Sequence, residues 1–146
     1  MLIGEFTNKV GEKNRVAIPV KFRTELGDKL IITRGYEGSL IIVDIKLWTN
    51  LIKEFGDRAF SVSLVRDTRR FLIGGAHEIE MDAQGRFVMP ENLLEYAEIK
   101  EEIVFVGLED WIEVWDKNKW NNKLSELNKK AGEIAENLSK VTRKEA

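Results

Sequence analysis

The sequence has no cysteine, only two prolines and a single histidine among its 146 residues. The absence of cysteine excludes disulfides, thiolate nucleophiles and thiolate metal sites, and it is compatible with a reducing compartment. Residues 1–6 lack the basic region and apolar stretch of a secretory signal, and no segment approaches the ~18 apolar residues of a membrane span. We therefore expect a cytoplasmic protein without a membrane partner.

Catalytic and metal-binding patterns are also missing. The lone His77 has no second histidine to share a metal, and the acidic pairs at 101–102 and 109–110 have no nucleophile or phosphate-binding glycine motif beside them. We expect a protein that is not an enzyme and has no cofactor, metal or small-molecule substrate. Hydrophobic residues make up 43% and charged residues 33% of the chain, which is typical of a folded globular protein.

The chain contains an internal repeat. Residues 9–19 (KVGEKNRVAIP) are echoed by residues 80–90 (EMDAQGRFVMP), which places Arg15 and Arg86 at equivalent positions 71 apart. The match continues at a spacing of 72 through the pairs Gly35 and Gly107, Glu37 and Glu109, Asp44 and Asp116, and Trp48 and Trp120. This period is too long for a solenoid and indicates two homologous modules, which we expect to share one core.

Each copy begins with turn residues followed by an apolar run that ends at a proline. Residues 5–18 are interpreted as two short strands around a turn at 12–14, and residues 82–85 supply the matching turn. Asn14 aligns with Gly85, and these residue types tolerate the positive φ that a tight hairpin requires. We therefore predict a hairpin at this point of both copies.

Helices and further strands are predicted downstream of each turn. Short helices should begin at Pro19 and Pro90, where the missing N–H is harmless. Apolar runs bounded by glycine predict strand pairs at 30–33 with 40–43 and at 103–106 with 111–115. Asp44 and Asp116 are candidate N-caps of longer helices, the first of which should end at Gly56. A linking helix is expected from about residue 58 to 73.

The last predicted helix carries apolar residues at heptad spacing. These are Trp120, Leu124, Leu127, Ala131, Ile134, Leu138 and Val141. Such a stripe is suited to docking on a partner surface, and we expect the tail at 141–146 to be frayed. The four tryptophans, at 48, 111, 115 and 120, are assigned to packing in the core or against another subunit.

Several of these motifs resemble the MraZ family. They are the segment GEF at 4–6, KNR at 13–15 with IP at 18–19 and FR at 22–23, RRFL at 69–72, and MDAQGR at 81–86 with MP at 89–90. The likeness covers about residues 1–126. It implies an α+β fold in which two tandem AbrB-like modules of the swapped-hairpin type form a pseudo-symmetric, β-barrel-like core. The modules fall at 5–47 and 76–119, with a helical linker at 48–75 and a C-terminal helix and tail at 120–146.

The same resemblance implies a function and an assembly. Proteins of this kind are bacterial, nucleoid-associated regulators that bind short G-rich direct repeats in the promoter of the division and cell-wall gene cluster. The expected partner is therefore double-stranded DNA, and the expected assembly is a homo-oligomer, typically an octameric ring. The alternative that stays open is an AbrB-like oligomeric scaffold or protein-interaction module without sequence-specific DNA binding.

Local charge separates the two copies as candidate DNA contacts. The net charge is only −2, but residues 9–23 carry five cations against one acid, whereas residues 80–91 carry three acids and one cation. The first copy is thus the better partner for a polyanion. The candidate DNA-binding residues are Lys9, Lys13, Asn14 and Arg15 in the first copy and Gln84, Gly85 and Arg86 in the second.

Within this set, Arg15 is the expected base contact, since an arginine can hydrogen-bond guanine through two atoms. Lys9 and Lys13 should neutralise phosphates. The family pattern Asp-x-x-x-Arg is present as Asp82 and Arg86, but the first copy has Gly11 at the matching position. We therefore expect Arg86 to be restrained by an ion pair and Arg15 to be freer. Whether Arg86 contacts DNA or only pairs with Asp82 stays open at this point.

Overall fold

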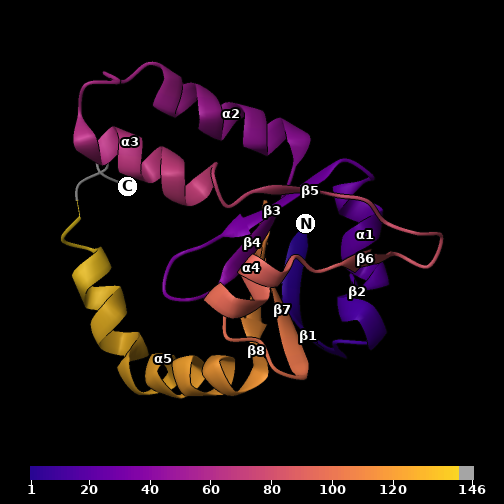
Figure 1. Cartoon of the computed structure of the whole chain (residues 1–146). Helices are drawn as coiled ribbons and strands as arrows, with labels where there is room; N and C mark the ends of the chain where they lie inside the picture. The colour runs from indigo at the N-terminus through magenta and orange to yellow at the C-terminus, as the bar shows by residue number, and fades with distance from the viewer. Residues whose placement is uncertain (142–146) are drawn as a thin grey trace.

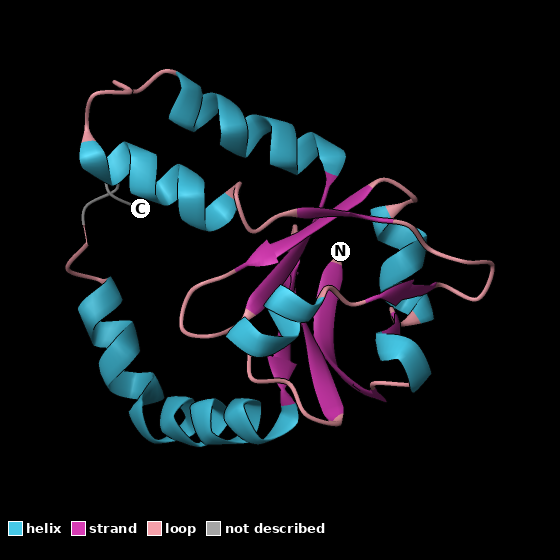
Figure 2. Ribbon diagram, viewed as in Figure 1, coloured by secondary structure: helices cyan, strands magenta, loops and turns pink. Residues whose placement is uncertain are grey.

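The structure is a computed structural model that describes residues 1–141, so most of the tail expected to fray lies outside the described residues. In chain order the elements are β1 (Leu2–Lys9), a 3₁₀ turn η1 (Glu12–Asn14), β2 (Arg15–Ala17), α1 (Val20–Leu26), β3 (Leu30–Arg34), β4 (Leu40–Asp44), α2 (Ile45–Gly56), α3 (Ser63–Leu72), β5 (His77–Ile79), β6 (Arg86–Val88), α4 (Glu91–Tyr96), β7 (Glu102–Glu109), β8 (Ile112–Asp116) and α5 (Lys117–Leu138). The strands gather at the centre and helices lie around them, which confirms the α+β class (Figures 1 and 2).

Six strands form one antiparallel sheet in the order β1-β7-β8-β4-β3-β5. The predicted strand pairs are confirmed as the hairpins β3–β4 and β7–β8, which meet through β4 and β8. At this junction Leu40 lies opposite Val114 and Ile42 opposite Ile112. Because 40 and 112, and 42 and 114, are equivalent positions of the repeat, the sheet has an approximate two-fold axis between its two central strands.

The outer strands cross from one repeat to the other. Strand β1 of the first half pairs with β7 of the second, β5 of the second half pairs with β3 of the first, and β2 pairs with β6 in a separate two-stranded sheet. The prediction of a hairpin within each copy at 5–18 and at the matching second segment is therefore wrong. Strand β2 has only three residues, whereas β7 matches all eight residues of β1, so the crossed arrangement pairs more backbone groups.

The large sheet is open, because β1 and β5 each have one strand partner within residues 1–141. A closed barrel is therefore not formed by the strand pairing of the described residues. The two halves nevertheless share a single core, as expected, since Val16, Ile18 and Phe22 from the first half are buried with Phe87 and Met89 from the second.

Both predicted helix N-caps are confirmed. Asp44 accepts a hydrogen bond from the amide of Leu47 at 2.8 Å, and Asp116 accepts from the amides of Asn118 and Lys119. Each carboxylate satisfies amides that the first turn of a helix leaves without a partner. The two caps fix where α2 and α5 leave the equivalent strands β4 and β8.

Helix α5 packs on the sheet only through its first half. Trp120, Leu124 and Leu127 contact a small cluster that includes Trp115, whose ring lies 5.5 Å from that of Trp120. Farther along, the heptad residue Leu138 is 64% exposed. This half of the helix extends past the sheet (Figure 1), so the apolar stripe continues beyond the surface that it covers. None of the helices in residues 1–141 combines the length and apolar character needed to cross a membrane.

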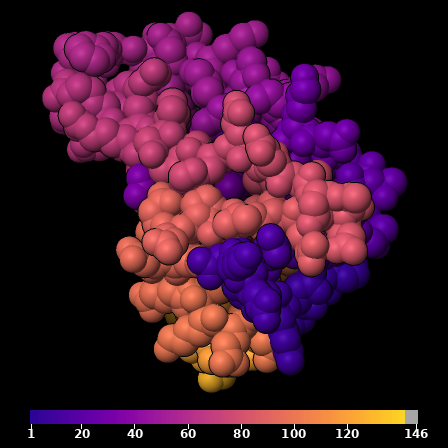
Figure 3. Space-filling view, turned by 45° about the vertical axis from the view of Figure 1, so that its right-hand side comes forward, coloured from indigo at the N-terminus to yellow at the C-terminus, as the bar shows by residue number. Residues whose placement is uncertain are grey.

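Helices α2 and α3 form a lobe that stands off the main body (Figure 3). Helix α3 begins at Ser63, later than the predicted start near residue 58. The delay arises because residues 57–62 form turns whose carbonyls, at Phe60 and Ser61, accept hydrogen bonds from Arg66. At the other end of α3, Thr33 and Arg34 of β3 donate to the carbonyls of residues 70–72, which fixes the lobe to the sheet.

Candidate nucleic-acid interface

The repeated arginines lie on one face of the two-stranded sheet formed by β2 and β6, called the ribbon below. Arg15 is opposite Val88, and Arg86 is opposite Ala17. Because side chains alternate across a strand, these four residues share one face, while the central pair Val16 and Phe87 points into the core and is buried. Two arginines 71 residues apart in sequence are thereby placed diagonally on a single outward surface.

Two loops flank the ribbon and have the same backbone closure. We call residues 11–15 the first loop and residues 82–86 the second loop. The amide of Gly11 donates to the carbonyl of Arg15 at 2.8 Å, and the amide of Asp82 donates to that of Arg86 at 2.9 Å. Each loop also accepts a hydrogen bond from the residue that follows the partner strand. The amide of Met89, after β6, donates to the carbonyl of Asn14, and the amide of Ile18, after β2, donates to the carbonyl of Gly85. The loops and the ribbon therefore form one continuous hydrogen-bonded unit.

The first loop presents exposed cations. Lys13 and Arg15 are exposed, and Lys9 is exposed at the end of β1, two residues before the loop begins. None of these three side chains takes part in an ion pair within the described part of the chain. Asn14 has φ +59°, which confirms the prediction of a positive φ there, and Lys13 shares this conformation at +58°. The predicted first-copy residues are thus gathered at one end of the ribbon.

The second loop is organised by one carboxylate. Oδ1 of Asp82 accepts hydrogen bonds from the amides of Gln84 and Arg86, both at 2.9 Å, and Oδ2 accepts from Nε of Arg86 at 2.9 Å. The bond from the Arg86 amide is the main cause that lowers the pKa of Asp82 below its ordinary value, and the side-chain bond from the Arg86 guanidinium adds to it. The expected ion pair is therefore present, and it leaves both Nη groups of Arg86 free of this carboxylate.

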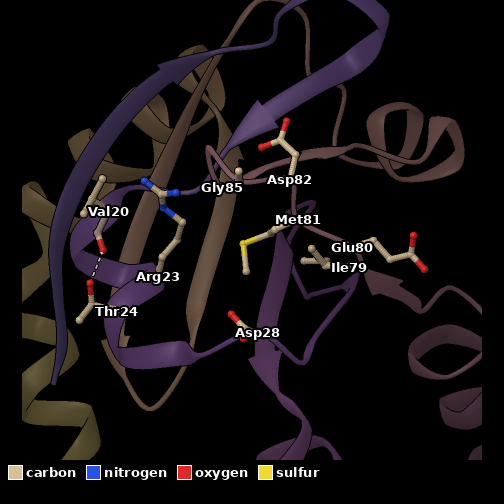
Figure 4. Close-up of a pocket in the computed structure, with 10 residues that line it drawn as sticks. Val20, Arg23, Thr24, Asp28, Ile79, Glu80, Met81, Asp82 and Gly85 are labelled. Carbon is tan, nitrogen blue, oxygen red and sulfur yellow. Dashed lines mark hydrogen bonds between the residues drawn. The ribbon is translucent and has the colours of Figure 1, made fainter.

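Gly85 is buried, unlike its exposed neighbours Gln84 and Arg86. It has φ +75°, and the side chain of Arg23 from α1 lies where a Cβ at position 85 would be (Figure 4). Gly85 therefore shapes the loop and presents no side chain. The contact with Arg23 was not predicted from the sequence, because α1 and the second loop are about sixty residues apart. The one sequence feature that sets Arg23 apart is that the equivalent residue of the second repeat is Leu94, which carries no charge.

Two cations of α3 and the histidine are engaged elsewhere. Arg70 forms an ion pair with Asp67 at 2.8 Å, and Arg66 holds the loop before α3, as described above. His77 lies 3.0 Å from the side-chain oxygen of Asn92 through Nε2. No group of three or more potential metal-ligating side chains is found among residues 1–141. The ribbon and its two loops are thus the surface on which the two equivalent arginines of the repeat come together.

These features define a class of protein: a tandem repeat of two αβ modules that exchange strands and build one arginine-bearing ribbon between them. A family model described as "MraZ protein, putative antitoxin-like" matches residues 1–71 and again residues 72–141. The chain therefore belongs to the MraZ family. The double match agrees with the internal repeat and with the two-fold arrangement of the sheet.

Relatives are similar over nearly their whole length. A protein of Acetivibrio thermocellus named transcriptional regulator MraZ is 39% identical over 139 residues, which cover 95% of this chain and 97% of the relative. Proteins with the same name from Clostridium acetobutylicum and Halothermothrix orenii are each 38% identical, over 141 and 135 residues, covering 97% and 92% of this chain and 99% and 94% of those relatives.

Proposed function

We propose that this protein is a sequence-specific DNA-binding transcriptional regulator that contacts duplex DNA through the outward face of the ribbon and its two loops. The observation that carries the proposal is the placement of Arg15 and Arg86 on that one face. Relatives named transcriptional regulators across almost the full chain length support the same role. The protein acts without catalysis, cofactor or small-molecule substrate in this proposal.

The shape of the ribbon suits the major groove. That groove is about 12 Å wide and admits a two-stranded β-ribbon. Arg15 and Arg86 occupy diagonal positions on the outward face, so a ribbon laid along the groove brings both guanidinium groups to base edges. A bidentate bond from arginine to O6 and N7 of guanine contributes about 1–3 kcal/mol of discrimination, which fits G-rich target repeats.

The two loops divide the work of binding. Lys13 in the first loop and Lys9, two residues before that loop, are exposed, and in this proposal they neutralise phosphates of the groove wall. Asn14 contacts a base edge or phosphate there. In the second loop Asp82 takes up one donor of Arg86, and the two Nη groups stay available for guanine. The ion pair thus orients Arg86 and leaves it in the interface. Gln84 is exposed in the same loop.

The proposal includes a homo-oligomer, and the resemblance to the family favours an octameric ring. Large apolar side chains are exposed on two separate parts of the chain, which supports self-association. On the lobe Phe60 is 80% and Leu64 is 76% exposed, and on the far half of α5 Ile134 and Leu138 are exposed at heptad spacing. A ring would present several ribbons to repeated DNA boxes and raise the affinity through effective concentration.

We also propose that the target of this protein is direct repeats in the promoter of the bacterial division and cell-wall gene cluster. Its proposed location is cytoplasmic and nucleoid-associated. We further propose that the two modules have the swapped-hairpin type of AbrB-like fold. The crossed pairing of β1, β2 and β5 supports it, because each copy gives strands to the other.

The alternative is an oligomeric scaffold or protein-interaction module without sequence-specific DNA binding. The exposed apolar stripe on the far half of α5 is the observation that favours it, since such a stripe is a surface for another helix. The two functions are separable by position. Replacing Ile134 and Leu138 with glutamate should abolish a protein contact and leave the binding of one ribbon to DNA intact.

The test of the proposal is binding to labelled duplexes that carry G-rich direct repeats or the same bases scrambled, at two salt concentrations. The wild-type protein should prefer the repeats, and Arg15→Ala should lose most of that preference. Lys53→Ala on α2 is the matched control, because it removes an exposed cation away from the ribbon. Equal weak binding to both duplexes by the wild type would instead leave the scaffold as the function.

A further inference from the structure

Arg23 occupies an unusual position between α1 and the second loop. Figure 4 shows its side chain rising from α1 toward Gly85, with Asp82 beyond. A Cβ built on Gly85 would overlap Cδ, Cζ and Nη1 of Arg23, so the guanidinium lies directly against the backbone of the loop. Gly85 also has φ +75°, a conformation that favours glycine. The lack of a side chain at residue 85 and its positive φ together allow the guanidinium of Arg23 to lie against the loop.

No local interaction accounts for the placement of Arg23. Its Nε atom is buried and has no hydrogen-bond partner in the described structure, and none of the ion pairs among residues 1–141 includes it. A buried guanidinium N–H without a partner is unfavourable, because the group has lost its water. Arg23 instead lies against the backbone of Gly85 in the second loop. With Asp82 and Ala83 it also lines the adjacent cavity of about 730 Å³.

The arrangement exists in one half only. The residue equivalent to Arg23 is Leu94, a half-buried side chain that packs against the shared core. Within residues 1–141, the position equivalent to Arg23 therefore places no arginine at the first loop. Because Arg23 belongs to the first repeat and the second loop to the second repeat, the contact is made between the two halves of the chain.

We infer that Arg23 is a positioning residue for the second loop: it supports the backbone at Gly85 and thereby sets the direction in which Arg86 leaves the ribbon. The carbonyl of Gly85 also accepts a hydrogen bond from the amide of Ile18 at 3.1 Å. Residue 85 is thus held by both Ile18 and Arg23, and Arg86 follows it directly. The consequence for DNA binding rests on the proposed function, whereas the support of the loop does not.

The first arm of the test uses the free protein and measures amide hydrogen exchange. In Arg23→Ala the amides of Gln84 and Arg86, which donate to Asp82, should exchange about tenfold faster than in the wild type. The amide of Gly11 in the first loop should keep its rate. Lys21→Ala is the matched control on the same helix, since the ammonium group of Lys21 lies over the ring of Phe6 in β1. Unchanged exchange at residues 84 and 86 would overturn the inference.

The second arm measures the preference for G-rich repeats over scrambled duplex. Arg23→Ala should lower this preference by about the same factor as Arg86→Ala, and the double variant should lose no more than Arg86→Ala alone, because both act through one side chain. Losses that simply multiply would contradict positioning and indicate a direct phosphate contact by Arg23. A wild type without any preference refutes the proposed function, and the exchange arm still decides the role of Arg23.

If Arg23→Ala does not fold, Arg23→Met keeps the test decisive. Methionine retains an aliphatic stem against the loop but lacks the guanidinium that covers Gly85. We expect this variant to have the wild-type melting temperature within a few degrees and still to show the faster exchange at residues 84 and 86. A folded Arg23→Met with wild-type exchange and wild-type preference for the repeats would overturn the inference.

Discussion

The two loops have the same backbone hydrogen bond but reach it with different residues. In the first loop, consecutive left-handed residues, Lys13 and Asn14, turn the chain, and no carboxylate is present at Gly11. In the second loop, Asp82 binds two amides and a guanidinium, and Gly85 is seated against an arginine from the other half. The first loop carries free charge, whereas the second is held in place.

This difference shows how a duplicated element can keep its shape while its chemistry changes. Backbone closure sets where each arginine leaves the ribbon, so both copies must retain it. Charge and restraint are set by side chains, which have diverged. We therefore expect the first loop to supply most of the salt-dependent attraction to DNA and the second loop to supply a pre-oriented base contact.

The largest expected effect is a loss of stability when the buried face of the ribbon, which holds both loops, is disrupted. Phe87→Ala removes a buried ring from the core beneath both arginines and should lower the free energy of unfolding by about 3–5 kcal/mol. Val88→Ala on the same strand is the control, since this side chain is 60% exposed and should change little. Denaturant unfolding measures both variants, and equal losses would mean that the ribbon's inward face is not part of the core.

The next effect separates the two arginines. Arg15→Ala and Arg86→Ala should each cost about 1–3 kcal/mol of discrimination between G-rich and scrambled duplex. Arg15→Ala should also make the salt dependence shallower, whereas replacing Asp82 with Asn and Arg86 with Ala together should leave it nearly unchanged, because that double variant removes a neutral ion pair. Binding titrations at several salt concentrations give both quantities. A salt slope altered equally by Arg15→Ala and by the double variant would contradict the proposed division of work.

A smaller effect is expected when the first loop is made to resemble the second. Position 11 has extended backbone angles, φ −86° and ψ −172°, so Gly11→Asp should be accommodated. The new carboxylate can pair with Arg15 as Asp82 does with Arg86, and the slope of log affinity against log salt should become shallower by about 0.9, the value of one phosphate contact. Gly11→Asn, which has the same shape without the charge, should keep the wild-type slope.

The smallest effect is a pH dependence confined to the second loop. The pKa of Asp82 is lowered in the folded protein, so the order that this carboxylate provides is present above its unfolded pKa and is lost as pH falls through the folded pKa. Nuclear magnetic resonance should show the amides of Gln84 and Arg86 losing protection in that acid range, while the Gly11 amide does not follow. In Asp82→Asn this transition should be missing; its persistence would assign the change to another group.

Local structure was largely predictable from this sequence because the repeat shows each signal twice. The glycine-bounded apolar runs predicted both hairpins of the large sheet, and the aspartates at 44 and 116 predicted two helix starts. The positive φ at Asn14 and Gly85 followed from residue type. All of these features depend on neighbours within a few residues, which is the range over which sequence pattern is informative.

Strand partners were not predictable in the same way. An apolar run such as residues 16–18 is equally compatible with pairing inside its own copy or with the other copy, since alternation indicates a buried face and does not name a neighbour. In the structure β2 pairs with β6, and the paired residues Val16 and Phe87 are buried in the same core cluster. The contact of Arg23 with Gly85 was missed for the same reason, because it joins the two halves.

One measurement tests the central claim most directly: binding to a G-rich repeat duplex in which guanines are replaced one at a time by 7-deazaguanine, which lacks the N7 acceptor. The wild type should lose about 1–3 kcal/mol at one or more positions. Arg15→Ala should lose nothing further at the position that Arg15 contacts, and Arg86→Ala should be insensitive at a different one. Equal sensitivity of all three proteins at every guanine would contradict base contact by the ribbon arginines.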